Sequence, residues 1–396
     1  MNLSEKAIHI TPSLTLEITA KANQLKSQGI DVIGFGAGEP DFQTPDYIKE
    51  AAIEAINKGF TKYTAASGMI ELKEAICEKL QKDNGLTYDV SQIVISNGAK
   101  HSIYNALTAI LNPGDEVLIP SPYWLSYPEM VRLADGKAIF IEGKEENNFK
   151  ITAKQFEESI TQKTKALILN SPNNPTGAVY KKNELRKIAD IAEKHNIIII
   201  SDEIYEKLIY EGKHVSIASF NDKIKDLTVV VNGMSKAYAM TGWRIGYTAS
   251  NSQIAAVMSN IQSHTTSNPN SIAQYASIAA LKGGEGIIKH MIDEFNKRRV
   301  FIVDKINKIK GLKCLKPDGA FYIFVNINEY IGKNINGKNI KNSVDFANVL
   351  IENANVAVIP GLPFGADNYI RLSYAMSIEN IDKGLNRINN FLNSID

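Results

Sequence analysis

The sequence predicts an α/β fold, in which a mostly parallel central sheet has helices on both faces and a smaller α+β domain is attached. Three observations lead to this prediction. Continuous aliphatic strands alternate with long helical stretches, which is typical of parallel sheets covered on both faces. Polar and glycine-rich motifs follow these strands at their carboxyl ends, where such sheets bind ligands. After about residue 290 the strands have a mixed pattern, which indicates the smaller domain.

The N-terminal part is predicted as an arm, residues 1–14, and a helix that begins near Ser13 and ends at Gly29. A short apolar run in residues 31–42 then breaks into a loop rich in glycine and proline. In this loop Gly38 allows the backbone to approach a ligand closely. Two helices are predicted next, at residues 44–58 and 70–83.

The middle of the chain carries the strands of the predicted sheet. Five of them are expected, at residues 93–96, 117–119, 166–169, 197–200 and 229–231, and a helix at 97–111 follows the first. Towards the C-terminus, strands are expected at 319–325, 355–359 and 369–374, with flanking helices. Residues 326–343 are rich in Asn, Lys and Gly and are predicted as a solvated loop.

Composition excludes several function classes. The chain has 396 residues, 22% of them charged, and a formal net charge of +1, which favours neither a nucleic acid nor a membrane surface as partner. No apolar run has the length of a membrane span, and residues 1–10 lack the apolar core of a signal peptide. Cys77 and Cys314 are far apart in sequence, so neither a disulfide scaffold nor a zinc site is predicted. We expect a cytoplasmic, metal-free enzyme.

A lysine follows the last strand of the predicted sheet. Lys236 lies in the fourteen-residue run Gly233–Gly246, between small residues, with Arg244 eight positions further on. A buried ammonium is costly and tends to lose its proton, and a neutral lysine is a nucleophile suited to imine chemistry. Taken alone, a Ser-Lys pair is more often an exposed turn, so the alternative remains open on these residues alone.

A carboxylate follows the strand of four isoleucines. Asp202 is costly at the end of a buried strand unless a cation pairs with it, although Asp is also a common helix N-cap. Asp202 and Tyr205 precede Lys236 by 34 and 31 residues. Asn174 follows another strand in an Asn-Asn-Pro-Thr-Gly turn, where Asn is also an ordinary turn residue.

The run around Lys236, the spacing to Asp202 and the Gly36–Pro40 loop resemble the class I and II aminotransferases, and the resemblance extends to Arg371. Within that family the chain is most similar to the bacterial aspartate aminotransferase subgroup, which includes dual aspartate/prephenate enzymes. The resemblance implies a fold-type I transferase that depends on pyridoxal 5′-phosphate. It also implies three parts: an arm at 1–14, a small domain from 15–45 and 291–396, and a large cofactor-binding domain at 46–290.

The resemblance assigns roles to the cofactor residues. Lys236 would bind the cofactor covalently and act as general base and acid, Asp202 would pair with the ring nitrogen, and Asn174 and Tyr205 would hold the ring oxygen. The phosphate would lie at a helix N-terminus, which is a favourable anion site. Residues expected there or on the ring face are Gly98, Ala99, Lys100, Ser235, Arg244 and Trp124. Position 233 is Gly where many relatives have a phosphate-binding Ser.

The resemblance also assigns substrate residues and a partner. Arg371 would hold the α-carboxylate through its guanidinium fork, whereas a structural salt bridge is the alternative. Lys100 would hold a distal carboxylate, with help from the Ser13 and Thr15 hydroxyls. Tyr63 would reach the phosphate of a neighbouring subunit, which implies a homodimer with shared sites. Further substrate contacts are expected from Gly38, Asn174 and Trp124.

The expected activity is transfer of an amino group between aspartate or glutamate and 2-oxoglutarate or oxaloacetate, with prephenate as a further acceptor. The rivals are an aminotransferase for other amino acids and a β-lyase or cyclopropane-forming synthase of the same cofactor class. A non-enzymatic regulator of this type would carry a DNA-binding domain, for which the chain leaves no room before its first motif.

Overall fold

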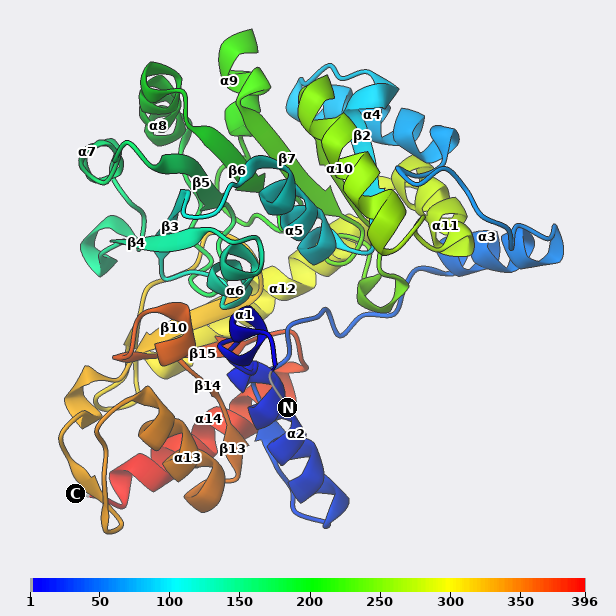
Figure 1. The fold of residues 1–396 in the computed structure, drawn as a ribbon. Coiled ribbons are helices and arrows are strands. Elements are labelled where there is room, and N and C mark those ends of the chain that lie inside the picture. Colours follow the sequence, from blue (N-terminus) through cyan, green and yellow to red (C-terminus); the bar gives the residue numbers. More distant parts are fainter. Residues whose placement is uncertain (1–2, 396) are drawn as a thin grey trace.

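A seven-stranded sheet forms the centre of the larger part of the molecule (Figure 1). The computed structural model describes residues 3–395. The strand order is β2-β8-β7-β6-β5-β3-β4, and β8 is antiparallel to both of its neighbours while the other strands run in one direction. The strands are β2 (Ile93–Ser96), β3 (Glu116–Ser121), β4 (Lys137–Glu142), β5 (Thr164–Asn170), β6 (Ile198–Asp202), β7 (Thr228–Gly233) and β8 (Gly246–Ala249).

Alternate residues of each central strand enter different cores. In β5, Ala166 and Ile168 pack with α5, α6 and α10, whereas Leu167 and Leu169 pack with α7, α8 and α9 on the opposite face. The four consecutive apolar residues of β5, 166–169, are therefore all buried, as the sequence predicted for a covered parallel sheet. The helices of this part are α3 (Asp46–Asn57), α4 (Ile70–Asn84), α5 (Ala99–Ile110), α6 (Ser126–Leu133), α7 (Ala153–Glu158), α8 (Lys182–His195), α9 (Asp222–Asp226), α10 (Ser252–Thr265) and α11 (Ser271–Lys282).

The five predicted strands of the sheet and the helices predicted at 44–58, 70–83 and 97–111 are confirmed. Sequence reasoning missed β4 and β8. β4 is an edge strand whose Phe140 is 51% exposed, so it lacks the buried aliphatic pattern of the others. β8 is four residues long and begins with Gly246, so it gave no apolar run.

The C-terminal part contains a four-stranded sheet of order β14-β15-β10-β9, whose pairs are antiparallel. The strands are β9 (Lys313–Cys314), β10 (Tyr322–Asn326), β14 (Ile359–Pro360) and β15 (Tyr369–Ser373). The helices are α12 (Glu285–Ile306), α13 (Ser343–Asn353) and α14 (Ile378–Asn393). The long helix α12 connects this part with the larger one (Figure 1).

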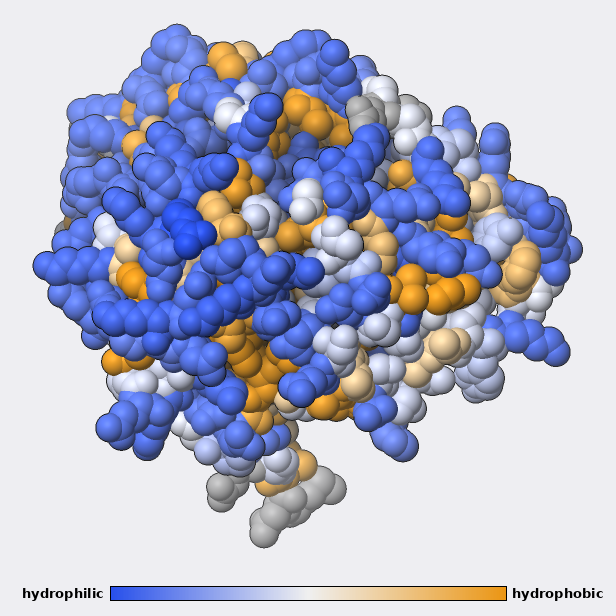
Figure 2. Space-filling model, turned by 90° about the horizontal axis from the view of Figure 1, so that it is seen from above, coloured by the Kyte–Doolittle hydropathy of each residue, from blue (hydrophilic) through white to orange (hydrophobic). Residues whose placement is uncertain are grey.

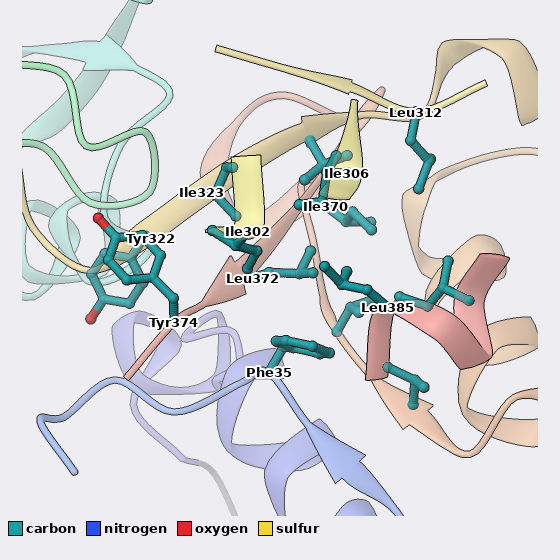
Figure 3. Packing of buried hydrophobic residues seen from close by; sticks show 14 of the residues in the cluster. Phe35, Ile302, Ile306, Leu312, Tyr322, Ile323, Ile370, Leu372, Tyr374 and Leu385 are labelled. Carbon is teal, nitrogen blue, oxygen red and sulfur yellow. The ribbon is translucent and has the colours of Figure 1, made fainter. Parts of the chain in front are cut away.

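The N-terminal segment contacts both parts: α1 (Glu5–Ile8) lies against α6 of the larger part, whereas α2 (Leu14–Ser27) and β1 (Ile33–Gly34) pack on the C-terminal part. There β1 pairs in parallel with β13 (Val356–Ala357). Phe35 is fully buried and points into the same core as Leu372 and Leu385 (Figure 3). Segments from the two ends of the chain therefore share one hydrophobic core, whereas the exact domain boundaries stay a prediction.

The prediction of a solvated loop at residues 326–343 was wrong in part. This segment contains a hairpin of β11 (Asn334–Ile335) and β12 (Lys338–Asn339). Ile335 and Ile340 are fully buried and belong to the core of the C-terminal part. Ile335 and Ile340 are single apolar residues in a polar stretch. The composition therefore indicated a solvated loop, although these two side chains are buried in the core.

The surface seen from above is mainly hydrophilic, with hydrophobic residues gathered in several separate areas (Figure 2). Within residues 3–395, none of the helices combines the length and the apolar character that a membrane crossing needs.

Candidate active site

A cavity of about 680 Å³ lies at the carboxyl ends of the central strands. Its walls come from these strand ends, from α2 and the loop after β1, and from β15. The predicted site residues that line it are Ser13, Thr15, Gly38, Ala99, Lys100, Trp124, Asn174, Asp202, Tyr205, Ser235, Lys236, Arg244 and Arg371. Residues far apart in sequence therefore share one cavity, as expected when parallel strands end at one edge of a sheet.

Lys236 lies just beyond β7, in the cavity wall. Its Nζ donates a hydrogen bond to the carbonyl oxygen of Gly38 and lies 5.7 Å from the ring centres of Tyr205 and Phe321. Burial, opposed by Glu39 and Asp202 and assisted by Arg371 and Arg244, lowers the pKa of Lys236 to about 8. This amine therefore becomes a neutral nucleophile at a much lower pH than a lysine in water.

Asp202 is the last residue of β6 and is 4% exposed. One carboxylate oxygen accepts a 2.6 Å hydrogen bond from the Tyr127 hydroxyl, and the other accepts one of 3.2 Å from the amide of Ile204. Burial raises the pKa of Asp202 to about 6, and these two hydrogen bonds counteract the increase. The carboxylate is held in place and has no cationic hydrogen-bond partner among the described residues, so it is available to a cation in the cavity.

Arg371 is 2% exposed on β15, yet it makes no ion pair within residues 3–395. Its Nη1 donates to Asn174 Oδ1 at 3.0 Å and its Nη2 donates to the carbonyl oxygen of Gly36 at 3.1 Å. The guanidinium lies 4.5 Å from the ring centre of Tyr322, and its buried Nε has no partner in the described chain. A buried cation without an acidic partner is costly, so an anion in the cavity would stabilise it.

Two residues of the site are held by contacts that the sequence did not reveal. The Tyr205 and Tyr322 hydroxyls are 3.0 Å apart, and burial raises the pKa of Tyr205. The backbone amide of Asn174 donates a hydrogen bond to Asn170 Oδ1 at 2.9 Å. Tyr127 and Tyr322 were missed because each is far in sequence from the residue that it holds. Asn170 is only four residues before Asn174, at the end of the same strand, but was not recognised as its partner. A buried Tyr hydroxyl needs a partner, which is the only signal that could have found the two tyrosines.

The N-terminus of α5 lies beside Arg244. Gly98 precedes this helix with φ of 90°, and a Cβ there would collide with the Arg244 guanidinium, so the position requires glycine. Arg244 donates to the carbonyl oxygens of Thr241 at 2.8 Å and Asn97 at 3.2 Å. Free backbone N–H groups and a guanidinium in one place form a favourable anion site.

Gly233, where many relatives have Ser, is tightly enclosed. A Cβ at this position would lie 2.8 Å from the carbonyl oxygen of Ile245 and 2.9 Å from the Cα of Gly246. A larger residue would therefore require the backbone of β8 to shift. The serine hydroxyl that remains near Lys236 is that of Ser235, which lines the cavity.

Lys100 and Trp124 lie together on one wall. The Lys100 Nζ is 4.9 Å from the Trp124 ring centre, and Trp124 packs edge-on against Tyr127. Partial burial, followed by the charge of Arg244, lowers the pKa of Lys100. Thr15 Oγ1 is buried without a partner in the described chain, so it is free to bond a ligand.

Gly98 directly precedes the lining residue Ala99 but does not itself line the cavity. Tyr63 lies outside the cavity. It lies in the segment between α3 and α4 and is 89% exposed.

A charged cluster, Glu203, Glu206 and His214, lies behind β6 and was not predicted. Its groups are bonded to one another and to neighbours: Glu203 accepts from His214 Nε2 at 2.8 Å, and Glu206 pairs with Lys79. Burial works to raise the pKa of Glu206, but Lys79 and His214 outweigh it and hold the pKa at about 2. The geometry is that of a buried ion-pair network.

Comparisons with known proteins agree with this geometry. The family model described as aminotransferase class I and II matches residues 30–388. The chain is 48% identical to an aspartate aminotransferase of Bacillus subtilis (strain 168) over 99% of both chains. It is 46% identical to a probable aspartate/prephenate aminotransferase of Aquifex aeolicus, again over 99% of both.

Solved structures give the same result. The aspartate aminotransferase of Rhizobium meliloti superposes with a TM-score of 0.97 at 42% identity over the whole of both chains. That of Thermus thermophilus with maleate gives 0.93 at 40% identity, covering 99% of this chain and 100% of the other. The predicted fold class and family are therefore confirmed, and this chain belongs to the class I and II aminotransferases.

Proposed function

We propose that this enzyme transfers an amino group between L-aspartate or L-glutamate and 2-oxoglutarate or oxaloacetate. The observation that carries the proposal is Arg371, a buried guanidinium with no acidic partner in the described chain, which faces the same cavity as Lys236. An amino acid has a carboxylate that can bind Arg371 and an amine that can react beside Lys236. Relatives named aspartate aminotransferase at 47–49% identity support the choice of substrate.

The family's cofactor is pyridoxal 5′-phosphate, and the cavity suits it. When bound, it supplies an imine and a protonated ring that withdraws electrons from the substrate α-carbon. Asp202, with no cationic hydrogen-bond partner in the described chain, fits the ring nitrogen, and the face of Trp124 fits the ring. Asn174 and Tyr205 would hold the ring oxygen. The phosphate would lie among Gly98, Ala99, Lys100, Ser235 and Arg244.

The chemistry of the chain itself centres on the Lys236 amine. In its neutral form it can take a proton from the substrate α-carbon and return it to a neighbouring atom, as a general base and then a general acid. Its pKa of about 8 is close to neutral pH, which favours both steps. Tyr127 stabilises the negative charge of Asp202, and this charge would keep the ring nitrogen of the cofactor protonated.

Recognition of a second carboxylate falls to Lys100. It is the cation on the wall formed with Trp124, and the unpartnered Thr15 hydroxyl and Ser13 line the same cavity. Maleate, which accompanies the Thermus thermophilus enzyme, is a dicarboxylate and fits such a pair of cationic sites. Gly38 completes the enclosure of the substrate next to Lys236.

Prephenate is a second candidate acceptor. Relatives named aspartate/prephenate aminotransferase are 46–48% identical to this chain. A compact ammonium such as that of Lys100 binds less selectively than a guanidinium fork, which favours a wider range of acceptors.

We further propose a homodimer with shared sites in the cytoplasm. Tyr63 is 89% exposed, and further exposed apolar side chains lie on α3, on α4 and in the segment between them, namely Ile53, Ile56, Ile70 and Phe60. A second copy covering this area would remove the apolar surface from water and bring Tyr63 to the partner's anion site.

The test is a panel of amino donors assayed with 2-oxoglutarate, except that glutamate is assayed with oxaloacetate, because glutamate and 2-oxoglutarate would only regenerate each other. Aspartate and glutamate should exceed alanine and phenylalanine by at least about tenfold in kcat/KM, because only they engage both cations. Lys100→Ala should lose activity mainly with the dicarboxylic donors. Lys26→Ala, which removes another lysine that lines the same cavity, serves as the control. Release of pyruvate or ammonia without transfer would identify a β-lyase. Equal loss for all donors in Lys100→Ala would remove the basis of the dicarboxylate assignment.

A further inference from the structure

The segment that carries Tyr63 has no helix or strand. Residues 58–69 connect α3 with α4, and the side chain of Tyr63 on this loop is 89% exposed. On a mobile loop, an aromatic side chain would pack against the surface of its own subunit, or its ordering on binding would cost conformational entropy. The contacts that fix this loop therefore decide how well Tyr63 can serve a second site.

Gln274 of α11 forms hydrogen bonds with the loop. It is fully buried, its Oε1 accepts from the amide of Met69 at 2.8 Å, and its Nε2 donates to Thr64 Oγ1 at 3.3 Å and to the carbonyl oxygen of Pro269 at 2.8 Å. Thr64 is adjacent to Tyr63, and Met69 ends the loop. One amide therefore holds both sides of the segment.

Gln262 of α10 holds the middle of the loop. It is also fully buried, and its Nε2 donates to the carbonyl oxygens of Ala66 at 2.5 Å and Ile95 at 2.7 Å. Its Oε1 accepts from Ser96 Oγ at 2.8 Å and Asn105 Nδ2 at 3.0 Å. All four hydrogen-bonding positions of the amide are used, so the side chain has one orientation.

The loop is also pressed against β2, the strand that leads to the anion site. The amide of Ile95 donates to the carbonyl oxygen of Ser67 at 3.0 Å. Gly68 has φ of 100°, and a Cβ there would collide with the Ile95 side chain. The start of the loop is tied to α11, since Ser271 Oγ donates to the carbonyl oxygen of Phe60 at 2.7 Å.

We infer that Gln274 and Gln262 are positioning residues that act on the active site of the second subunit through Tyr63. They hold the backbone at residues 66 and 69 and the side chain of Thr64, so that Tyr63 projects from this subunit in one direction, ready to bond a phosphate across the interface. This inference rests on the proposed shared site. It explains why two glutamines that touch no part of the cavity are completely buried and bonded to one loop.

The experiment uses heterodimers in which one chain carries Lys236→Ala, so that only the other chain can bind pyridoxal phosphate covalently. The measured quantity is the concentration of the cofactor that half-saturates borohydride-trapped label on Lys236. Gln274→Met on the Lys236→Ala chain, which lends its Tyr63 to the intact site, should raise this concentration about tenfold, as expected for the loss of an ordered hydrogen bond. The same substitution on the other chain should change it less than twofold.

Controls separate the inference from the shared-site proposal. Tyr63→Phe in the same two arrangements tests sharing itself: no effect from the Lys236→Ala chain would refute the shared site. If Tyr63→Phe acts across the interface but Gln274→Met acts equally from either chain, or from neither, the positioning role is refuted. Gln274→Glu, which keeps the acceptor for Met69, replaces Gln274→Met if that chain does not fold. Ala280→Gly weakens the same helix at a residue that does not bond the loop. It should leave the half-saturating cofactor concentration unchanged in both arrangements.

Discussion

The charge of the Lys236 amine depends strongly on its surroundings. In water a lysine has a pKa near 10.4, but burial and neighbouring arginines bring Lys236 to about 8. We expect the rate at which the apoenzyme captures pyridoxal phosphate to rise with pH and to level off above about pH 8. The appearance of the cofactor's new absorbance band at a series of pH values measures this. A rate that still rises tenfold per pH unit between about 9 and 10 would contradict the assignment of this pKa.

Asp202 depends on Tyr127, which stabilises its charged form. Asp202→Asn should lower kcat/KM on the order of 10³-fold, because the charge opposite the ring nitrogen is lost. Tyr127→Phe should have a smaller effect and should raise the pKa of Asp202 above its value of about 6, which moves the acid limb of the pH–rate profile upwards. Tyr123→Phe, a neighbouring tyrosine that makes no hydrogen bond to Asp202, is the control. An unchanged acid limb in Tyr127→Phe would mean that this hydrogen bond does not set the charge of Asp202.

Individual site residues were predictable where a motif contained them. Lys236, Asp202 and Arg371 follow or lie in strands with recognisable runs, so their meeting in one cavity could be predicted. Tyr127 and Tyr322 could not be found in this way, because their partners lie 75 and 117 residues away in the chain. The first pair is set by the packing of α6 on the central sheet, and the second by the packing of β10 against the segment after β6.

The strands were predicted where both faces are covered, since β2, β3, β5, β6 and β7 contain continuous apolar runs. β4 at the sheet edge and the hairpin of β11 and β12 escaped because their burial rests on few residues. The contact between α4 and the segment after β6 escaped for another reason: it joins Lys79 to Glu206, two charged residues that sequence patterns place on a solvated surface.

That contact predicts acid sensitivity. The folded-state pKa of Glu206 is about 2, below the unfolded value of 4.5, so its stabilisation is present above pH 4.5 and is lost as the pH falls towards 2. The free energy of unfolding, measured with urea between pH 3 and pH 7, should fall across this window. Glu206→Gln should be less stable at pH 7 and show a flatter dependence. Glu54→Gln, which breaks an exposed pair with Lys58, should leave the curve unchanged. A steep fall retained in Glu206→Gln would assign the acid sensitivity to other groups.

At the scale of the whole molecule, the cavity joins the two ends of the chain to its middle. Gly38 and Arg371 lie in segments that pack with the C-terminal part, whereas Asp202 and Lys236 follow strands of the large sheet. The resemblance of the sequence to its family predicted this arrangement, because local patterns alone could not show that residues 33–34 pair with residues 356–357.

A ligand that contacts both parts should stabilise the whole fold. At a pyridoxal phosphate concentration 100 times its dissociation constant, the free energy of unfolding should increase by about 2.7 kcal/mol. Thermal unfolding of the apoenzyme with and without the cofactor measures the effect, and Lys236→Ala should show a smaller increase at the same concentration. A cofactor that left the unfolding temperature of the wild type unchanged would not be bound in this cavity.

The central claim is that Lys236, in the cavity at the carboxyl ends of the central strands, is the residue that binds the cofactor. The most direct measurement is borohydride reduction of the protein with pyridoxal phosphate, followed by mass analysis of its peptides. The account predicts one stable adduct, on Lys236, and loss of the visible absorbance band on reduction. An adduct on Lys100 or any other lysine, with Lys236 unlabelled, would contradict it.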